Sequence, residues 1–219
     1  MKDFDPKIYW EKRLREKFDL NGVGDINLGV NYNNALYEIR KYAFHKLMKS
    51  FKTDFSNKKI LDIGSGTGFY IDRWSELNVK EINGSDITQV VVENLSKKYP
   101  EYKFTQMDIG ENNQNFTPTY DFISAFDVLF HIVDDKRFEN AIKNIHRLLN
   151  NSGYFIISDN FVHGKTIRLE HQVNRSLEFM NEVITTTGFK LIKTVPMFVL
   201  MNDPVDTNNR IIKKNLLDN

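Results

Sequence analysis

The sequence predicts an α/β fold in which a mostly parallel, doubly wound sheet carries helices on both faces. From Lys58 onward, short apolar runs alternate with helical patterns of ten or more residues, as in parallel strands joined by crossover helices. A glycine-rich turn joins the first run to its helix, and an acidic residue ends each of the next two runs. We therefore expect a helical cap or lid over residues 1–57 and a cofactor-binding domain over residues 58–219.

The N-terminal part of the chain is predicted to be helical. Residues 8–18 are charged and helical in pattern, with Pro6 near their start. Residues 22–34 are rich in Gly and Asn, which predicts an irregular loop. Residues 35–51 place apolar side chains at helical spacing, so this helix needs a surface to pack on.

The second part is predicted to alternate strands and helices. The strand candidates are residues 58–63, 80–87, 102–109, 120–126, 154–159 and 189–195. The helix candidates are residues 68–77, 89–99, 136–149 and 169–187. Right-handed crossovers place the ends of the first strands at one edge of the sheet, where ligands bind. A seventh strand is either the short segment 209–217, which is equally helical in pattern, or is missing.

Composition and charge restrict the function classes. The 219 residues carry a net charge of +1, so no global field attracts the chain to nucleic acid or to an anionic membrane. The absence of cysteine excludes disulfides, zinc–thiolate sites and cysteine nucleophiles. No run approaches the ~18 apolar residues of a membrane span, and the start is too charged for a signal peptide. We expect a cytoplasmic protein with no nucleic-acid partner and no membrane span.

The turn Gly64-Ser65-Gly66-Thr67-Gly68 follows the first strand and precedes a helix. Glycines allow a tight turn and let a ligand lie against the backbone, and the helix N-terminus offers unpaired N–H groups. The dinucleotide fingerprint G-x-G-x-x-G would need glycine at position 69, where this chain has Phe69. A nicotinamide dehydrogenase is therefore an alternative that the spacing disfavours.

Two acidic residues end the next two strands. Asp86 lies twenty residues after Gly66, where a carboxylate can accept hydrogen bonds from both hydroxyls of a ribose. Asp108 can accept an amino hydrogen from adenine, and Ile87 and Ile109 can provide apolar walls for the ring. Each acid by itself could equally be a helix cap or a turn residue. Together with the glycine turn, they predict a pocket for an adenosyl group.

Residues 58–195 resemble the class I S-adenosylmethionine-dependent methyltransferases, in particular the group that acts on small molecules. The resemblance is carried by LDIGSGTGF, the acids of GSDI and QMDI, and SAFDVLFHIVDD followed by IHRLLNNSGYFIISD. It implies a Rossmann-like fold and S-adenosylmethionine as cofactor. The glycines would pass under the methionine part, Asp62 would orient its amino acid moiety, and Phe126 and Asp127 would lie beside the sulfonium. The predicted cofactor-binding residues are Asp62, Gly64, Ser65, Gly66, Gly68, Asp86, Ile87, Asp108, Ile109, Phe126 and Asp127.

Other residues are candidates for the chemistry and for the acceptor. His131 follows the fourth strand by five residues, and an ordinary imidazole pKa suits a general base; the alternative is a histidine that only packs near the cofactor. His163, His171 and Arg175 lie in a donor-rich segment after the fifth strand and are predicted to contact substrate, unless that segment is only a solvated loop. Tyr32, in the Gly/Asn-rich stretch, is predicted to lie in a lid and to contact the substrate.

The favoured function is O-methylation of a small hydroxylated acceptor, with a sugar or glycan precursor slightly preferred because the expected lid is polar. A metal-dependent O-methyltransferase is an alternative, because Asp127, Asp159 and Asn160 could offer oxygen ligands to magnesium; we predict no metal. Methylation of nucleic-acid amino groups is disfavoured, because residues 127–130 read DVLF where such enzymes carry Asn/Asp-Pro-Pro-aromatic. A cofactor-binding regulatory module without turnover is a further alternative, and the oligomeric state stays open.

Overall fold

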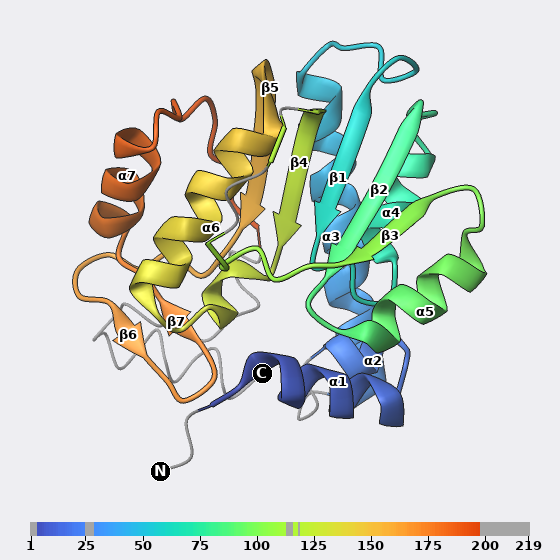
Figure 1. Ribbon diagram of the computed structural model, residues 1–219, viewed down its shortest axis with the longest axis horizontal. Coiled ribbons are helices and arrows are strands. Elements are labelled where there is room, and N and C mark those ends of the chain that lie inside the picture. The colour runs from blue at the N-terminus through green and yellow to red at the C-terminus, as the bar shows by residue number, and fades with distance from the viewer. Residues whose placement is uncertain (1–3, 25–28, 113–115, 118, 198–219) are drawn as a thin grey trace.

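The computed structural model describes residues 4–24, 29–112, 116–117 and 119–197. Its centre is a five-stranded parallel sheet of order β3-β2-β1-β4-β5 (Figure 1). The strands are β1 (Lys59–Ile63), β2 (Glu81–Asp86), β3 (Lys103–Gln106), β4 (Tyr120–Phe126) and β5 (Leu149–Ser158). The predicted α/β class and the first five predicted strands are confirmed. The strand order reverses beside β1, so the carboxyl ends of β1 and β4 diverge there and leave room for a ligand.

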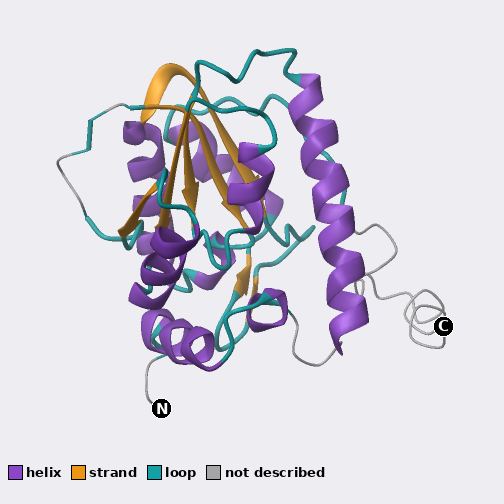
Figure 2. Ribbon diagram, turned by 90° about the vertical axis from the view of Figure 1, so that its right-hand side faces the viewer, coloured by secondary structure: helices purple, strands orange, loops and turns teal. Residues whose placement is uncertain are grey.

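Helices cover both faces of the sheet, as the alternating pattern predicts. One face is covered by α3 (Gly29–Ser50), α4 (Phe69–Ser75) and α5 (Gln89–Lys98), and the other by α6 (Asp135–Leu148) and α7 (Leu177–Thr186) (Figures 1 and 2). Neighbouring residues of a strand face opposite sides of the sheet. Ile60 accordingly packs in the core under α3 to α5, whereas Leu61 packs in the core under α6 and α7.

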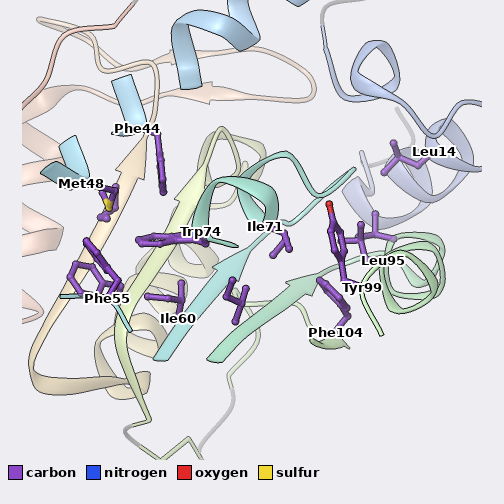
Figure 3. Close-up of a cluster of buried hydrophobic side chains, with 14 of the residues drawn as sticks. Leu14, Phe44, Met48, Phe55, Ile60, Ile71, Trp74, Leu95, Tyr99 and Phe104 are labelled. Atoms are coloured by element: carbon purple, nitrogen blue, oxygen red, sulfur yellow. The ribbon is translucent and has the colours of Figure 1, made fainter. Parts of the chain in front are cut away.

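The first core ties the last helix of the predicted cap to the sheet. Trp74 of α4 is fully buried at its centre, and the ring of Phe44 from α3 meets it edge-on at 5.0 Å (Figure 3). Met48 and Phe55 are buried in the same cluster (Figure 3). Because these side chains share one core, α3 is held rigidly against the sheet and can position residues toward its carboxyl edge.

Two further helices, α1 (Pro6–Glu16) and α2 (Leu20–Val23), lie across the carboxyl edge of the sheet (Figure 1). Glu11 fastens α1 there, since its Oε2 accepts hydrogen bonds from the backbone N–H of Gln89 at 2.7 Å and of Val90 at 3.3 Å. The irregular loop predicted for residues 22–34 is wrong in part. Asp19 caps α2 through its side chain, and helix α3 already begins at Gly29.

The C-terminal part departs most from the prediction. The helix expected over residues 169–187 begins only at Leu177, because β6 (Ile167–Arg168) and β7 (Val173–Asn174) form a small antiparallel hairpin before it. Residues 189–195 do not form the predicted strand. Leu191 and Ile192 are 60% and 68% exposed, so the apolar residues of this segment are not buried against a sheet. The candidate seventh strand, 209–217, lies outside the described residues. Among the helices described, none combines the length and apolarity needed to cross a membrane.

Candidate active site

The glycine turn forms as predicted between β1 and α4. Gly64, Gly66 and Gly68 have φ values of 69°, 52° and 86°, a region that side chains other than glycine rarely adopt. The backbone N–H groups of Gly64 and Ser65 donate to the carbonyl oxygen of Ser85 at 2.8 and 3.0 Å, which fixes the turn to the end of β2. A Cβ on Gly64 would lie 2.3 Å from Val128 Cγ2, so this close approach also requires glycine.

Two predicted cofactor residues, Asp62 and Gly68, lie at the two ends of the turn. Asp62 is 2% exposed, and its Oδ1 accepts a hydrogen bond from Ser124 Oγ at 2.6 Å, while Trp74 Nε1 donates to Ser124 Oγ at 3.0 Å. Burial raises the pKa of Asp62 to about 7, against the lowering effect of its hydrogen bonds. Gly68 faces Leu95 of α5 and Tyr99, the residue that follows this helix. Neither residue is among those that line the cavity described below, and a direct contact of either with a ligand stays a prediction.

Asp86 ends β2 and lines the cavity. Its Oδ1 accepts hydrogen bonds from the backbone N–H and the hydroxyl of Thr88 at 3.0 and 2.8 Å, and its Oδ2 accepts from Gly66 N–H at 3.2 Å. Burial raises the pKa of Asp86, although these hydrogen bonds act in the opposite direction. A carboxylate offers about four lone-pair sites, so one remains for a ligand hydroxyl, and the Gly66 contact joins this acid to the turn.

Asp108 follows β3 at the same edge. Its Oδ1 accepts a hydrogen bond from the N–H of Gly110 at 2.9 Å, and its Oδ2 forms an ion pair with the Nη2 of Arg137. Ile109 is 4% exposed and packs in the core beneath α6. The acid therefore sits at the boundary between the hydrophobic core and the cavity.

One cavity of about 2000 Å³ runs along the carboxyl edge of the sheet and continues past α3 and β5. It exceeds the ~300–1,000 Å³ of an ordinary ligand pocket, so it can hold a cofactor and an acceptor together. The predicted residues that line it are Gly64, Ser65, Gly66, Asp86, Ile87, Asp108, Ile109, Phe126, Asp127 and His131. The structure thus brings most of the predicted site into one place.

The residues at the donor end fit an adenosyl cofactor. Asp86 ends β2, Asp108 closely follows the neighbouring β3, and both residues line the cavity. Within the glycine turn, the buried Thr67 Oγ1 has no hydrogen-bond partner among the described residues, and a buried polar atom of this kind calls for a partner. Ile87 and Met107 add apolar surface between the two acids.

Asp127 stands at the end of β4 in an unusual conformation. Its φ is 59°, which is uncommon for a residue other than glycine and often marks a functional site. Arg40 of α3 donates to its Oδ2 through Nε at 2.9 Å and Nη2 at 2.7 Å, and Ser158 Oγ donates to its Oδ1 at 2.8 Å. The carboxylate is thus fixed by a cation from the cap and a hydroxyl from the neighbouring strand.

Aromatic side chains form the wall beside this ion pair. Tyr37 lies 5.0 Å from the Arg40 guanidinium and 4.7 Å from the ring of Phe69. Tyr70 stacks on Phe126 at 3.8 Å between ring centroids. Burial raises the pKa of Tyr37 to about 12 and that of Tyr70 well above its usual range. Both phenols therefore stay protonated at neutral pH and can donate hydrogen bonds.

Arg40 was not among the site residues predicted from the sequence. A signal was present, because Leu36, Phe44 and Met48 are buried on α3 at intervals of four residues or a multiple of four, and Arg40 falls in the same stripe. A charged side chain on the buried face of an amphipathic helix needs a partner of opposite charge. That partner is Asp127, which is distant in sequence. The helical pattern therefore indicates that Arg40 needs an acidic partner, but it does not identify the partner.

His131 lies in the short 3₁₀ helix η2 (Leu129–His131) and lines the cavity. Its Nδ1 lies 3.0 Å from the carbonyl oxygen of His171, and the ring of Trp10 from α1 meets it edge-on at 5.1 Å. Because a carbonyl only accepts, Nδ1 must carry the hydrogen and Nε2 keeps its lone pair. Burial lowers the pKa of His131 to about 4, so the imidazole is neutral at physiological pH.

Arg175 is the clearest correction among the predicted acceptor residues. Its side chain is 1% exposed, and its Nη2 donates to the carbonyl oxygen of Ile132 at 2.7 Å and to Asp135 Oδ1 at 3.0 Å. The guanidinium also lies 4.0 Å from the ring centroid of Phe138. Arg175 therefore holds the start of α6 and the segment after η2 in place, and it has no surface in the cavity.

The other three predicted acceptor residues also lie outside the cavity lining in the described part of the chain. Tyr32 is half-buried in the first turns of α3, and His163 is exposed. His171 is exposed as well, but its ring stacks near Tyr9 and its carbonyl oxygen meets His131. His171 therefore reaches His131 through its backbone, whereas Asp159, Asn160 and Phe161 of the same segment line the cavity.

The oxygen ligands required by the metal-dependent alternative are already engaged. Asp127 is paired with Arg40, and a guanidinium there competes with a metal cation. Asp159 lines the cavity, but its Oδ1 accepts from Asn160 N–H at 2.7 Å, and burial raises its pKa to about 7. Asn160 is exposed, and the described residues contain no group of three or more His, Cys, Asp or Glu able to hold a metal. These residues do not fit a magnesium site.

Comparison with solved structures supports the fold. The magnesium protoporphyrin IX methyltransferase of Synechocystis, solved with bound S-adenosylmethionine, superposes with a TM-score of 0.64 at 14% identity, covering 89% of this chain and 91% of that one. The YcgJ protein of Bacillus subtilis gives a TM-score of 0.56 at 19% identity, covering 67% of each chain. At such identities the likeness concerns the fold.

Two curated relatives match parts of the sequence. A tRNA U34 carboxymethyltransferase of Campylobacter hominis is 28% identical over 133 residues, 58% of this chain and 44% of that protein. A ribosomal protein L11 methyltransferase of Staphylococcus haemolyticus is 31% identical over 107 residues, 47% of this chain and 32% of that protein. The matches span less than half the length of either relative.

The family comparison covers most of the chain. Residues 35–191, from α3 to the segment after α7, match the family model described as a methyltransferase domain. This range includes the glycine turn, both strand-end acids, Arg40 and His131. The chain therefore belongs to the methyltransferase-domain family, and it shares the fold of a methyltransferase that has been solved with bound S-adenosylmethionine.

Proposed function

We propose that the protein methylates a hydroxyl group of a small acceptor. The observation that carries this proposal is the state of His131: one ring nitrogen is committed to the carbonyl oxygen of His171, and the other keeps a lone pair in a residue that lines the cavity. A hydroxyl acceptor must lose a proton as it is methylated, and a neutral imidazole can accept it.

The glycine turn and the two strand-end acids form the donor side of the cavity, which would bind and orient the cofactor. Asp86 would accept hydrogen bonds from the ribose, Asp108 from the adenine amino group, and the glycine turn would lie along the methionine part. When bound, the cofactor supplies an activated methyl group on a sulfonium. Because Asp86 ends β2 and Asp108 closely follows the neighbouring β3, the two carboxylates would hold the nucleoside in one orientation.

His131 would act as the general base and accept the proton at Nε2. The acceptor hydroxyl would give its proton to Nε2 of His131, while the bound cofactor would supply the methyl group and, with its carbon–sulfur bond broken, leave as the neutral thioether S-adenosylhomocysteine. The imidazolium that results is stabilised by the carbonyl oxygen of His171 and by the negative charge of Asp127. Trp10 covers the imidazole and limits the access of water to it, so His131 favours the neutral form once product leaves.

The cap supports a small acceptor. Glu11 fastens α1 over the start of α5, and Trp10 on the same helix packs on His131. A polymer would have to displace these contacts to reach the cavity. The wall formed by Tyr37, Phe69 and Tyr70 suits a flat ring, which includes an aromatic ring and the apolar face of a sugar or glycan precursor.

An RNA acceptor is the second candidate, because one relative is a tRNA U34 carboxymethyltransferase. The test is release of S-adenosylhomocysteine from S-adenosylmethionine, measured with phenols, sugars, sugar phosphates, small amines and unmodified tRNA as separate acceptors. We expect turnover with a small hydroxylated compound and none with tRNA. Turnover with tRNA alone would refute the proposal, as would turnover confined to amines.

A further inference from the structure

Arg137 lies at the adenine end of the cavity and has no role in the function proposed above. It belongs to the first turn of α6, where Asp134 caps the helix by accepting a hydrogen bond from the backbone N–H of Arg137 at 2.8 Å. This cap fixes the backbone from which the side chain leaves. The side chain is 48% exposed, lines the cavity and pairs with Asp108 across the gap between α6 and β3.

The pairing determines how the Asp108 carboxylate presents its lone pairs. Gly110 N–H occupies one site on Oδ1, and the Arg137 guanidinium occupies one on Oδ2. A carboxylate has about four such sites, so one on each oxygen remains. With both oxygens held by fixed donors, the carboxylate cannot rotate freely, and the remaining sites keep constant directions.

We propose that Arg137 is a positioning residue for the cofactor, which holds Asp108 as an acceptor for the exocyclic amino group of a 6-aminopurine. The inference rests on the proposed function in one respect, the placement of adenine beside Asp108. Arg137 confers selectivity because a fixed, ionised acceptor favours an amino donor and repels an oxygen at the same position. The flat guanidinium also borders the cavity, where it can lie along the purine ring.

The experiment measures binding by isothermal titration calorimetry at constant ionic strength. The two ligands are S-adenosylhomocysteine and its analogue with a 6-oxo group in place of the 6-amino group. The proteins are the wild type, R137A, R137K and the control K136A, which changes an exposed neighbour on the same helix. Circular dichroism melting verifies that each variant is folded before it is titrated.

We expect the wild type to prefer the 6-amino ligand by roughly tenfold or more, the effect of one charge-assisted hydrogen bond. R137A should lose most of this preference, mainly through weaker binding of S-adenosylhomocysteine. R137K keeps the charge without the planar fork, so it should retain part of the preference. K136A should match the wild type.

Three results would overturn the inference, and they differ in what else they affect. If R137A keeps the full preference, Arg137 does not position Asp108, while the placement of adenine stands. If R137A binds S-adenosylhomocysteine more tightly, Arg137 competes with the cofactor for Asp108. If the wild type shows no preference, adenine does not lie at Asp108, and the donor side of the proposed function fails as well. If R137A does not fold, the R137K titration is used instead, and full retention of the preference for the 6-amino ligand by R137K would overturn the inference.

Discussion

The donor half and the acceptor half of the cavity are built in different ways. The donor half consists of consecutive strand ends, with the glycine turn, Asp86 and Asp108 following β1, β2 and β3 in chain order. The acceptor half combines Trp10 and Arg40 from the cap with His131 and the backbone of a hairpin far along the chain. A site built from consecutive strand ends is specified locally, whereas one assembled across the fold depends on how its elements pack.

Replacing His131 by Gln should have the largest effect and should separate the two halves. Loss of a general base lowers kcat by roughly 100-fold or more, while the donor half is untouched and the dissociation constant of S-adenosylhomocysteine should stay unchanged. Steady-state kinetics and calorimetry on the same preparation test this. His163→Gln, at an exposed histidine outside the cavity lining, is the matched control. A kcat within a factor of three of the wild type would remove His131 from the chemistry.

Replacing Asp86 by Ala should mainly weaken cofactor binding, whereas the His131 variant mainly lowers kcat. The variant loses the ribose acceptor and leaves the N–H of Gly66 without its partner, which should weaken cofactor binding by roughly 30- to 100-fold. Calorimetric titration with S-adenosylhomocysteine measures this change. At saturating cofactor, kcat should fall much less than it does in the His131 variant. Unaltered affinity would show that Asp86 only supports the turn.

Replacing Arg40 by Gln should test the contact that links the halves. The partly buried Asp127 carboxylate would lose its cation, at a cost of about 1–3 kcal/mol in the free energy of unfolding, since Asp127 is 31% exposed and partly solvated. Urea denaturation measures this cost. The double variant R40Q/D127N should recover much of the loss, because it removes both charges. Additive losses in the double variant would contradict a coupled pair.

The pH dependence of kcat/KM should sharpen the assignment of the base. A base acts when deprotonated, so activity is lost as the pH falls through its pKa. His131, with a pKa lowered to about 4 by burial, predicts an acid limb near pH 4 and a flat profile from pH 5 to 8. Asp159, with a pKa raised to about 7, would instead place the limb near pH 7. An acid limb near pH 7 that disappears in Asp159→Asn would transfer the role to Asp159.

The accuracy of the sequence predictions follows the same division. Asp86 and Asp108 line the cavity as expected, because a strand end fixes where a side chain must lie. The expectation for Arg175 differs from the structure because a run of hydrogen-bond donors after β5 does not show where each side chain points. The guanidinium of Arg175 points into the core, toward Asp135. The strand predicted for residues 189–195 failed for a related reason. Alternating apolar residues form a strand only where a sheet edge or a core receives them.

The sequence by itself determined the α/β class, the parallel strands and the positions of the glycine turn and of Asp86 and Asp108 at the strand ends, because glycine geometry and hydrophobic periodicity act over a few residues. Only the tertiary structure decided that Arg40 neutralises Asp127, that Arg137 pairs with Asp108, and that His131 is kept neutral under Trp10. These are contacts between segments far apart in the chain. Their strength depends on burial and distance, which no local pattern encodes.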